Sequence, residues 1–257
     1  FMNTGDMGIN SAVGQQGIFI GGLVTGGFQN DGDIVSTQNA ISLIQGGTSL
    51  IGDFINNGNV TSLNEASILL NGGIDGSFTN AGQIGLGTGV RSGLQGIIIG
   101  EQITGNFLNV GDIFSTQSGI QLSGAGVGVQ GNFENNGAID SSDNTAILIN
   151  GAVGGSFSNT GALLASTATG RGISIATTVG NGFSNSGHIG SGTDRVGQQG
   201  IFVGGQISSN FLNEGDIFSA QSGIQLNQGG ISVTGNFTNT GRIDSSLNTA
   251  ILVNGGV

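Results

Sequence analysis

The side chains best placed for chemistry are three ionisable residues at one position of a repeated motif. The motif Phe-x-Asn-x-Gly-x-(Ile/Val/Leu/Met) occurs ten times, and its sixth residue is His188, Asp216 and Arg242 in the last three copies. If the copies stack, these residues form a His–Asp pair beside an Arg, an arrangement suited to proton transfer. No Ser or Cys nucleophile is placed beside them. We therefore favour a row of alternating surface charges, which contributes little to stability.

The same position carries two neighbouring carboxylates near the start of the chain, Asp6 and Asp33. Like charges at strand spacing repel, unless they share a cation such as Ca²⁺. The calcium-binding repeat Gly-Gly-x-Gly-x-Asp is absent from the sequence. Asp140, Asp143 and Asp244 lie near predicted corners, where solvated Asp is common. We expect no specific metal site and no cofactor.

Composition excludes several classes of protein. The chain has 257 residues, of which 54 are Gly, with no Pro or Cys and a formal net charge of −11. Collagen needs abundant Pro, and disulfide scaffolds need Cys. The basic residues are four Arg, too few for a surface that binds nucleic acid. No run of about 18 apolar residues is present, so we expect no transmembrane helix.

The repeat organises the whole chain into ten units that begin 24 to 29 residues apart. We expect them to form a single domain over residues 1–257. Each unit contributes one Phe, one Asn two residues later and one Gly four residues later. The units begin at Phe1, Phe28, Phe54, Phe78, Phe107, Phe133, Phe157, Phe183, Phe211 and Phe237. The Asn residues are Asn3, Asn30, Asn56, Asn80, Asn109, Asn135, Asn159, Asn185, Asn213 and Asn239.

The units also fall into three-unit blocks. We define the first, second and third blocks as the units that begin at Phe1, Phe78 and Phe183, each with the two units that follow. One unit, which begins at Phe157, stands outside the blocks. The spacing suggests duplication of a three-unit ancestor.

Each unit contains short segments of alternating apolar residues, separated by corners rich in Gly, Ser and Asn, which predicts strands. A unit of about 26 residues buries its apolar face only by stacking on its neighbours. We therefore predict an all-β, right-handed parallel β-helix of about ten three-strand coils. The inward-facing Phe would stack, and the Asn amides would hydrogen-bond along the axis. The motif Gly would permit a tight corner or a positive φ.

One outward position could form an apolar interaction stripe. In six of the ten units, the Ile that follows a small residue is itself followed by a large apolar residue, namely Phe19, Leu69, Ile98, Leu148, Phe202 and Leu252. A second outward set is Val35, Phe114 and Phe218. Exposed apolar surface often marks an interaction site. The alternative is that loops cover these side chains, or that they are tolerated scatter.

The runs Gly-Ser-Phe-Thr-Asn-Ala-Gly-Gln-Ile (76–84) and Gly-Asn-Phe-Thr-Asn-Thr-Gly-Arg-Ile (235–243) resemble passenger repeats of bacterial autotransporters and haemagglutinin-like adhesins. The resemblance extends over the whole chain. It implies a β-helix that is secreted or displayed on the bacterial cell surface, with adhesive or matrix roles. Such a chain would be a segment of a longer protein, whose anchoring domain is not in this sequence.

We therefore expect an extracellular structural or adhesive rod without enzymatic activity. Its partners would be further copies, joined end to end or laterally, or a cell or matrix surface. The alternative is a carbohydrate-active β-helix enzyme, since glycoside cleavage needs two positioned carboxylates. Trp and Tyr, which commonly hold sugars, are absent, and so is Lys.

Overall fold

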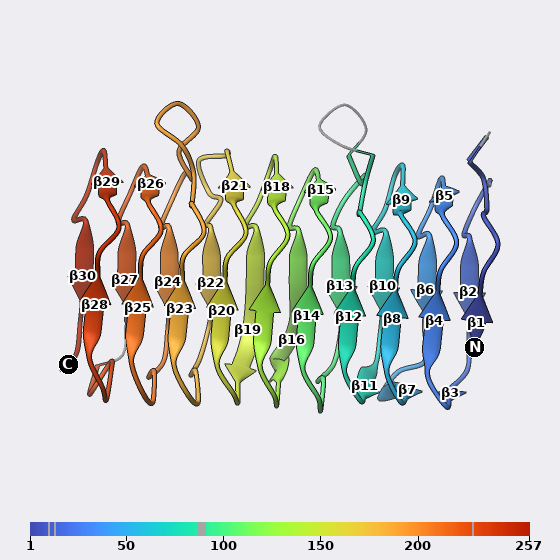
Figure 1. Ribbon diagram of the computed structural model, residues 1–257, viewed down its shortest axis with the longest axis horizontal. Coiled ribbons are helices and arrows are strands. Elements are labelled where there is room, and N and C mark those ends of the chain that lie inside the picture. Colours follow the sequence, from blue (N-terminus) through green and yellow to red (C-terminus); the bar gives the residue numbers. More distant parts are fainter. Residues whose placement is uncertain (10, 13, 87–90, 228) are drawn as a thin grey trace.

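The computed structural model describes residues 1–9, 11–12, 14–86, 91–227 and 229–257, and it shows a β-solenoid. The turns stack along one axis, with the first and last residues at opposite ends (Figure 1). All strand pairs in the described residues are parallel, and each joins one unit to the next. The predicted fold class is confirmed, with ten strands and nine steps between them in each of two long sheets.

The first long sheet consists of the Phe-x-Asn part of every motif. Phe pairs with Phe and Asn with Asn at each step, so the register is fixed by identical side chains. Its strands are β1 (Met2–Asn3), β4 (Phe28–Asn30), β8 (Phe54–Asn56), β12 (Phe78–Asn80), β14 (Phe107–Asn109), β17 (Phe133–Asn135), β20 (Phe157–Asn159), β23 (Phe183–Asn185), β25 (Phe211–Asn213) and β28 (Phe237–Asn239).

The second long sheet is formed where an Ile follows a small residue in each unit. Its strands are β2 (Ile18–Ile20), β6 (Ile41–Leu43), β10 (Ile68–Leu70), β13 (Ile97–Ile99), β16 (Ile120–Val129), β19 (Ile147–Val153), β22 (Ile173–Ile175), β24 (Ile201–Val203), β27 (Ile224–Leu226) and β30 (Ile251–Val253).

Two narrower sides complete each turn. The Ile that ends the motif lies beyond a bend, in β5 (Ile34–Ser36), β9 (Val60–Ser62), β15 (Ile113–Ser115), β18 (Ile139–Ser141), β21 (Leu163–Ala165), β26 (Ile217–Ser219) and β29 (Ile243–Ser245). The apolar residue four before the next Phe lies in β3 (Val24–Thr25), β7 (Thr48–Ile51) or β11 (Gly73–Asp75), at the end of β16 or β19, or in single bridges. The motif is thus divided between two sides of the turn.

The bend between these two sides explains the motif Gly. A Cβ on Gly58 would collide with the carbonyl oxygen of Gly32 in the preceding turn, and Gly111 meets Gly82 in the same way. Neither Gly58 nor Gly111 has a positive φ. The sequence left open whether the motif Gly provides a tight corner or a positive φ, and at these positions the tight corner is the reason. The inward-facing apolar side chains form a continuous buried cluster along the axis.

The first unit of each block has the longest loop, directly after the motif. In all three blocks the loop begins at a Gly with positive φ, namely Gly8 at 70°, Gly85 at 73° and Gly190 at 68°. This conformation is readily available only to Gly, so the chain leaves the strand there. The loop around residues 190–195 projects from the side of the rod that carries β26 and β29 (Figure 1).

Candidate functional site

The Asn column forms a hydrogen-bonded ladder through the whole rod. The Nδ2 of each Asn donates to the Oδ1 of the Asn one turn later, at 2.7–2.8 Å. The same Nδ2 donates to the carbonyl oxygen of the motif Gly at 2.8–2.9 Å. Both amide protons are therefore used. From Asn30 to Asn213 the ladder residues are completely buried, where an unpaired amide would be costly.

The Phe column stacks beside this ladder. Ring centroids of successive Phe residues lie 4.6–5.1 Å apart, and their planes differ by at most 12°. This spacing equals the separation of neighbouring strands, so the backbone pairing itself places the rings in contact. The two columns give the rod a continuous core that depends on every turn.

A second polar ladder, interrupted at Gly27 and Gly182, lies at the residue before the Phe, and the sequence analysis missed it. Asp53 Oδ1 accepts a hydrogen bond from the backbone N–H of Ser77, and Ser77 Oγ accepts one from Asn106. Asn106 and Asn132 continue the pattern at 2.8 and 2.9 Å. The recurrence of Asp, Ser and Asn at this position was visible in the sequence and could have revealed the ladder.

The sixth motif position, which held the candidate acid–base and calcium residues, is also a ladder. Asp6 Oδ1 accepts from the backbone N–H of Asp33 at 2.9 Å, and Asp33 Oδ1 accepts from Asn59 at 2.7 Å. Each carboxylate therefore bonds the next turn's backbone. No group of three or more potential metal ligands occurs in the described part of the chain.

The residues His188, Asp216 and Arg242 do not assemble as an acid–base site. Asp216 Oδ1 accepts from the backbone N–H of Arg242 at 2.8 Å, as elsewhere in this column. The Arg242 side chain turns to Asp244, with an Nη2–Oδ2 distance of 2.8 Å. The structure gives the exposed His188 imidazole no hydrogen bond to Asp216 among the described residues.

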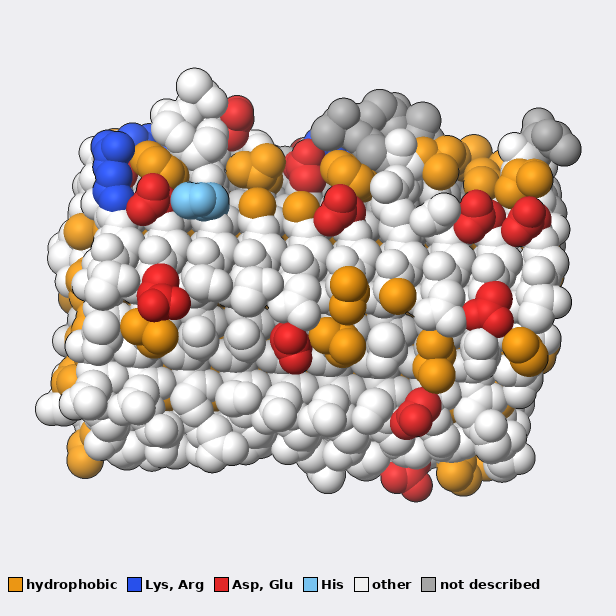
Figure 2. Space-filling view, in the orientation of Figure 1, with side chains coloured by type: hydrophobic (Ala, Val, Ile, Leu, Met, Phe, Trp, Pro, Cys, Tyr) orange, Lys and Arg blue, Asp and Glu red, His pale blue; other side chains and the backbone are white. Residues whose placement is uncertain are grey.

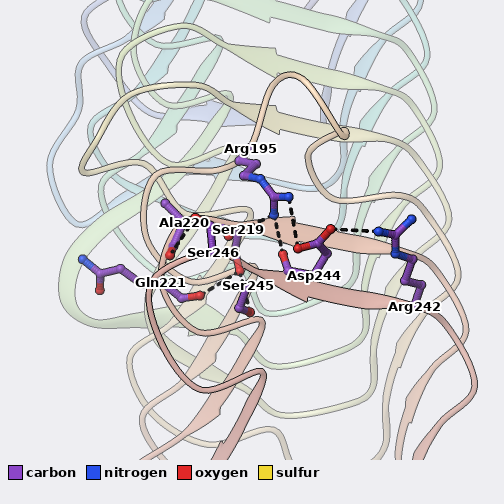
Figure 3. Close-up of polar contacts among 8 residues, drawn as sticks. All are labelled: Arg195, Ser219, Ala220, Gln221, Arg242, Asp244, Ser245 and Ser246. Carbon is purple, nitrogen blue, oxygen red and sulfur yellow. Dashed lines mark hydrogen bonds and ion pairs between the residues drawn. The ribbon is translucent and has the colours of Figure 1, made fainter.

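Two arginines instead tie the long loops to turns farther along the rod. Arg195 Nη1 donates to the carbonyl oxygen of Asp244 at 2.7 Å, and its Nη2 lies 3.0 Å from Asp244 Oδ1 (Figure 3). Arg91 makes the same two contacts with Asp140, at 2.8 and 2.7 Å. Each pair is 49 residues apart in sequence. We call these contacts the arginine straps.

Electrostatics and packing reinforce the strap of the third block. Hydrogen bonding to Arg195 above all, together with the charges of Arg195 and Arg242, lowers the pKa of the Asp244 carboxyl. The two guanidinium groups lie 6.0 and 5.3 Å from the ring of Phe218. Loop residues thus cover part of the second outward apolar set, as one of the two alternatives for that set expects.

The proposed apolar stripe lies on the outer face of the second long sheet, but polar residues interrupt it. Ser42, Gln121, Ser174 and Gln225 stand between the apolar members, so only two of them occupy adjacent strands: Leu69 and Ile98. Phe19 is 53% exposed. Leu69, Ile98, Leu148, Phe202 and Leu252 are half-buried. The space-filling view shows the other broad face of the rod, which carries the first long sheet; uncharged side chains and backbone predominate there, with scattered apolar and acidic groups (Figure 2).

Several shallow hollows mark the surface, two of which are lined in part by acidic residues. One, of about 410 Å³, is lined by Asp75, Glu101 and Thr104 with neighbouring Gly residues, and Thr104 Oγ1 donates to Asp75 Oδ1 at 3.1 Å. The other, of about 470 Å³, lies over Phe1, Phe28 and Gly52 near the first turns. The first is the place where two carboxylates share a concave surface.

No family model, curated protein or solved structure matches this chain. Among the described residues, no helix has the length and apolar character needed to cross a membrane. The assignment of function therefore rests on the side chains and contacts above.

Proposed function

We propose that the chain is a non-enzymatic, extracellular structural and adhesive rod, a segment of a bacterial surface fibre or adhesin stalk. The observation that carries the proposal is the Asn ladder, which continues from Asn3 to Asn239 without a break. The likeness of the sequence to passenger repeats of autotransporters supports a rod that is secreted or displayed on the cell surface.

The mechanism is mechanical. Backbone hydrogen bonds join each turn to the next, while the Asn and Phe columns fill the interior at the same repeat. Bending the axis would lengthen the hydrogen bonds between turns along the outer side of the bend, so the rod resists bending. A chain of about one-fifth Gly thereby becomes a stiff spacer that sets the distance between its two ends.

Association would use the outward apolar residues. Phe19 is the most exposed member of the stripe, and Ile98 stands beside Leu69 on the adjoining strand. These side chains could pack two rods laterally or hold the rod against a cell or matrix surface, and stacking of end turns would join copies end to end.

The experiment compares the wild-type chain with the Phe19→Ser/Ile98→Ser variant. Sedimentation over a concentration series reads self-association, and attachment of coated beads to host cells and matrix reads adhesion. We expect the variant to lose both, with an unchanged β-rich circular dichroism spectrum. A wild-type chain that stays monomeric and leaves beads unattached would contradict the adhesive part of the proposal. Thr79→Ser, on the other long sheet, is the matched control.

A carbohydrate-active enzyme is the second candidate, because Asp75 and Glu101 line one hollow. Paired carboxylates are the groups that glycoside hydrolysis requires. Reducing-sugar release from a panel of polysaccharides, compared with that of the Asp75→Asn/Glu101→Gln variant, tests it. Release that depends on both carboxylates would replace the rod proposal with an enzymatic one.

A further inference from the structure

Arg171 differs from the other three arginines of the chain. Arg91, Arg195 and Arg242 each form an ion pair with an Asp. All fifteen acidic residues lie in the described part of the chain, and none of them forms an ion pair with Arg171. Arg171 belongs to the unit that begins at Phe157, which stands outside the three blocks.

The guanidinium of Arg171 is nevertheless held in a defined place. It lies over the ring of Phe202, 4.7 Å from the centroid. Its Nε donates to Gln199 Oε1 at 2.6 Å, and its Nη1 donates to Ser174 Oγ at 3.3 Å. A guanidinium carries five N–H donors, so three of those of Arg171 have no partner among the described residues.

This environment disfavours an isolated cation. Arg171 is only partly exposed, and burial lowers the pKa of its guanidinium. Arginine presents paired donors that match the two oxygens of a carboxylate. Gln199 and Ser174 are neutral, so they do not balance the charge of the partly buried guanidinium. A bound anion would balance it.

The surroundings supply neutral hydrogen-bonding groups beside the cation. Gln199 Nε2 donates to Gln221 Oε1 at 3.3 Å, and Gln225 stands next to Phe202 on the adjoining strand. We propose that Arg171, Phe202 and the amides of Gln199, Gln221 and Gln225 form a binding site for the carboxylate of an acidic sugar.

Charge and chemistry select this ligand. The net charge of −11 repels a doubly charged phosphate more than a singly charged carboxylate. Planar amides both donate and accept hydrogen bonds, as sugar hydroxyl groups require. The site is separate from the rod proposal, because binding at one face requires neither stiffness nor self-association.

The four arginines make a direct test possible, since the labelled chain should give four Nε–Hε resonances in a ¹⁵N correlation spectrum. Titration with galacturonic acid, which carries one carboxylate, should shift the Arg171 resonance saturably and leave that of Arg91 unchanged. Its methyl ester, which lacks the charge, should bind at least about tenfold more weakly.

Variants and a competing ligand complete the test. Arg171→Gln should abolish the binding measured by calorimetry, whereas Arg91→Gln, which removes a paired arginine, should leave it unchanged. Equal shifts of all four resonances, or equal binding of the methyl ester, would overturn the site. Equal binding of N-acetylglycine, a singly charged carboxylate without sugar hydroxyl groups, would overturn the assignment to a sugar. Unaltered circular dichroism of Arg171→Gln shows that loss of binding is not loss of fold.

Discussion

The first and third blocks have the same turns, yet only the third has an arginine strap. In the third block, Arg195 pairs with Asp244 (Figure 3). The Arg195 guanidinium also lies 6.0 Å from the ring centroid of Phe218. The aligned residues of the first block are Ala12, Val35 and Thr61. The second block carries Arg91, Phe114 and Asp140, which match the third.

This difference indicates that the Arg, aromatic and Asp positions of the strap depend on one another. The carboxylate accepts the guanidinium, and the aromatic ring packs beneath the loop that carries it. Where the Arg is absent, the Asp is replaced by Thr61, which is buried and whose Oγ1 has no hydrogen-bond partner in the described residues. The Asn ladder, by contrast, is present in both blocks, where each Asn bonds to the Asn of the next turn.

The largest expected effect comes from placing the strap's carboxylate in the first block without its arginine. Thr61→Asp should lower the free energy of unfolding by about 3 kcal/mol, since it buries an unpaired charge. The triple variant Ala12→Arg/Val35→Phe/Thr61→Asp should recover most of that loss in urea unfolding. A triple variant no more stable than Thr61→Asp alone would show that the three positions do not act together.

The next largest effect concerns the Asn ladder, which the first and third blocks share. Asn56→Leu in the first block and Asn213→Leu in the third should each cost about 2–3 kcal/mol, because both leave neighbouring buried amides unpaired. The two losses should be equal, as each Asn bonds to the turn before and the turn after. Thermal melts of both variants measure this. A melting temperature at or above wild type would contradict an energetic role for the ladder.

A smaller effect is expected when the native strap is cut. Arg195→Gln removes an ion pair between side chains that are 27% and 30% exposed, so it should destabilise the chain less than either change above. Hydrogen exchange of residues 190–199 should nevertheless accelerate, while exchange of 14–17 in the first block stays unchanged. Unchanged exchange in both loops would mean that the strap does not hold the loop.

The smallest effect is a dependence on pH confined to the third block. The pKa of Asp244 is lowered from its ordinary 3.8, so the folded form binds a proton less readily than the unfolded form. The stabilisation is complete above that ordinary value and is lost as pH falls through the lowered pKa. Exchange of residues 190–199 should rise over this acidic range. An equal rise in Arg195→Gln would show that Asp244 titration is not the cause.

The fold could be predicted because its determinants recur in every unit. Phe, Asn and Gly at constant offsets indicated stacked strands and an internal amide ladder. The straps could not be found from an average repeat, since Arg195 and Asp244 lie 49 residues apart and two turns distant. Comparing aligned blocks would have revealed them, because Ala12, Val35 and Thr61 all differ from their counterparts together.

The candidate sites were harder to predict for a related reason. The position of a residue in its column correctly indicated which side chains lie next to it. It did not indicate which neighbour each side chain hydrogen-bonds or packs against. Asp216 bonds to the backbone of Arg242 and not to His188, and Arg171 reaches from its own turn across to Phe202. Such choices depend on side-chain length and on corners that the alternating pattern does not specify.

The measurement that tests the stiff rod most directly is a spin-label distance along its axis. The chain has no Cys, so Thr4→Cys and Thr240→Cys, both at exposed positions nine turns apart, can be labelled alone. Nine steps of strand spacing predict one narrow distribution centred near ~43 Å. A broad distribution, or a centre far from this length, would contradict the rod.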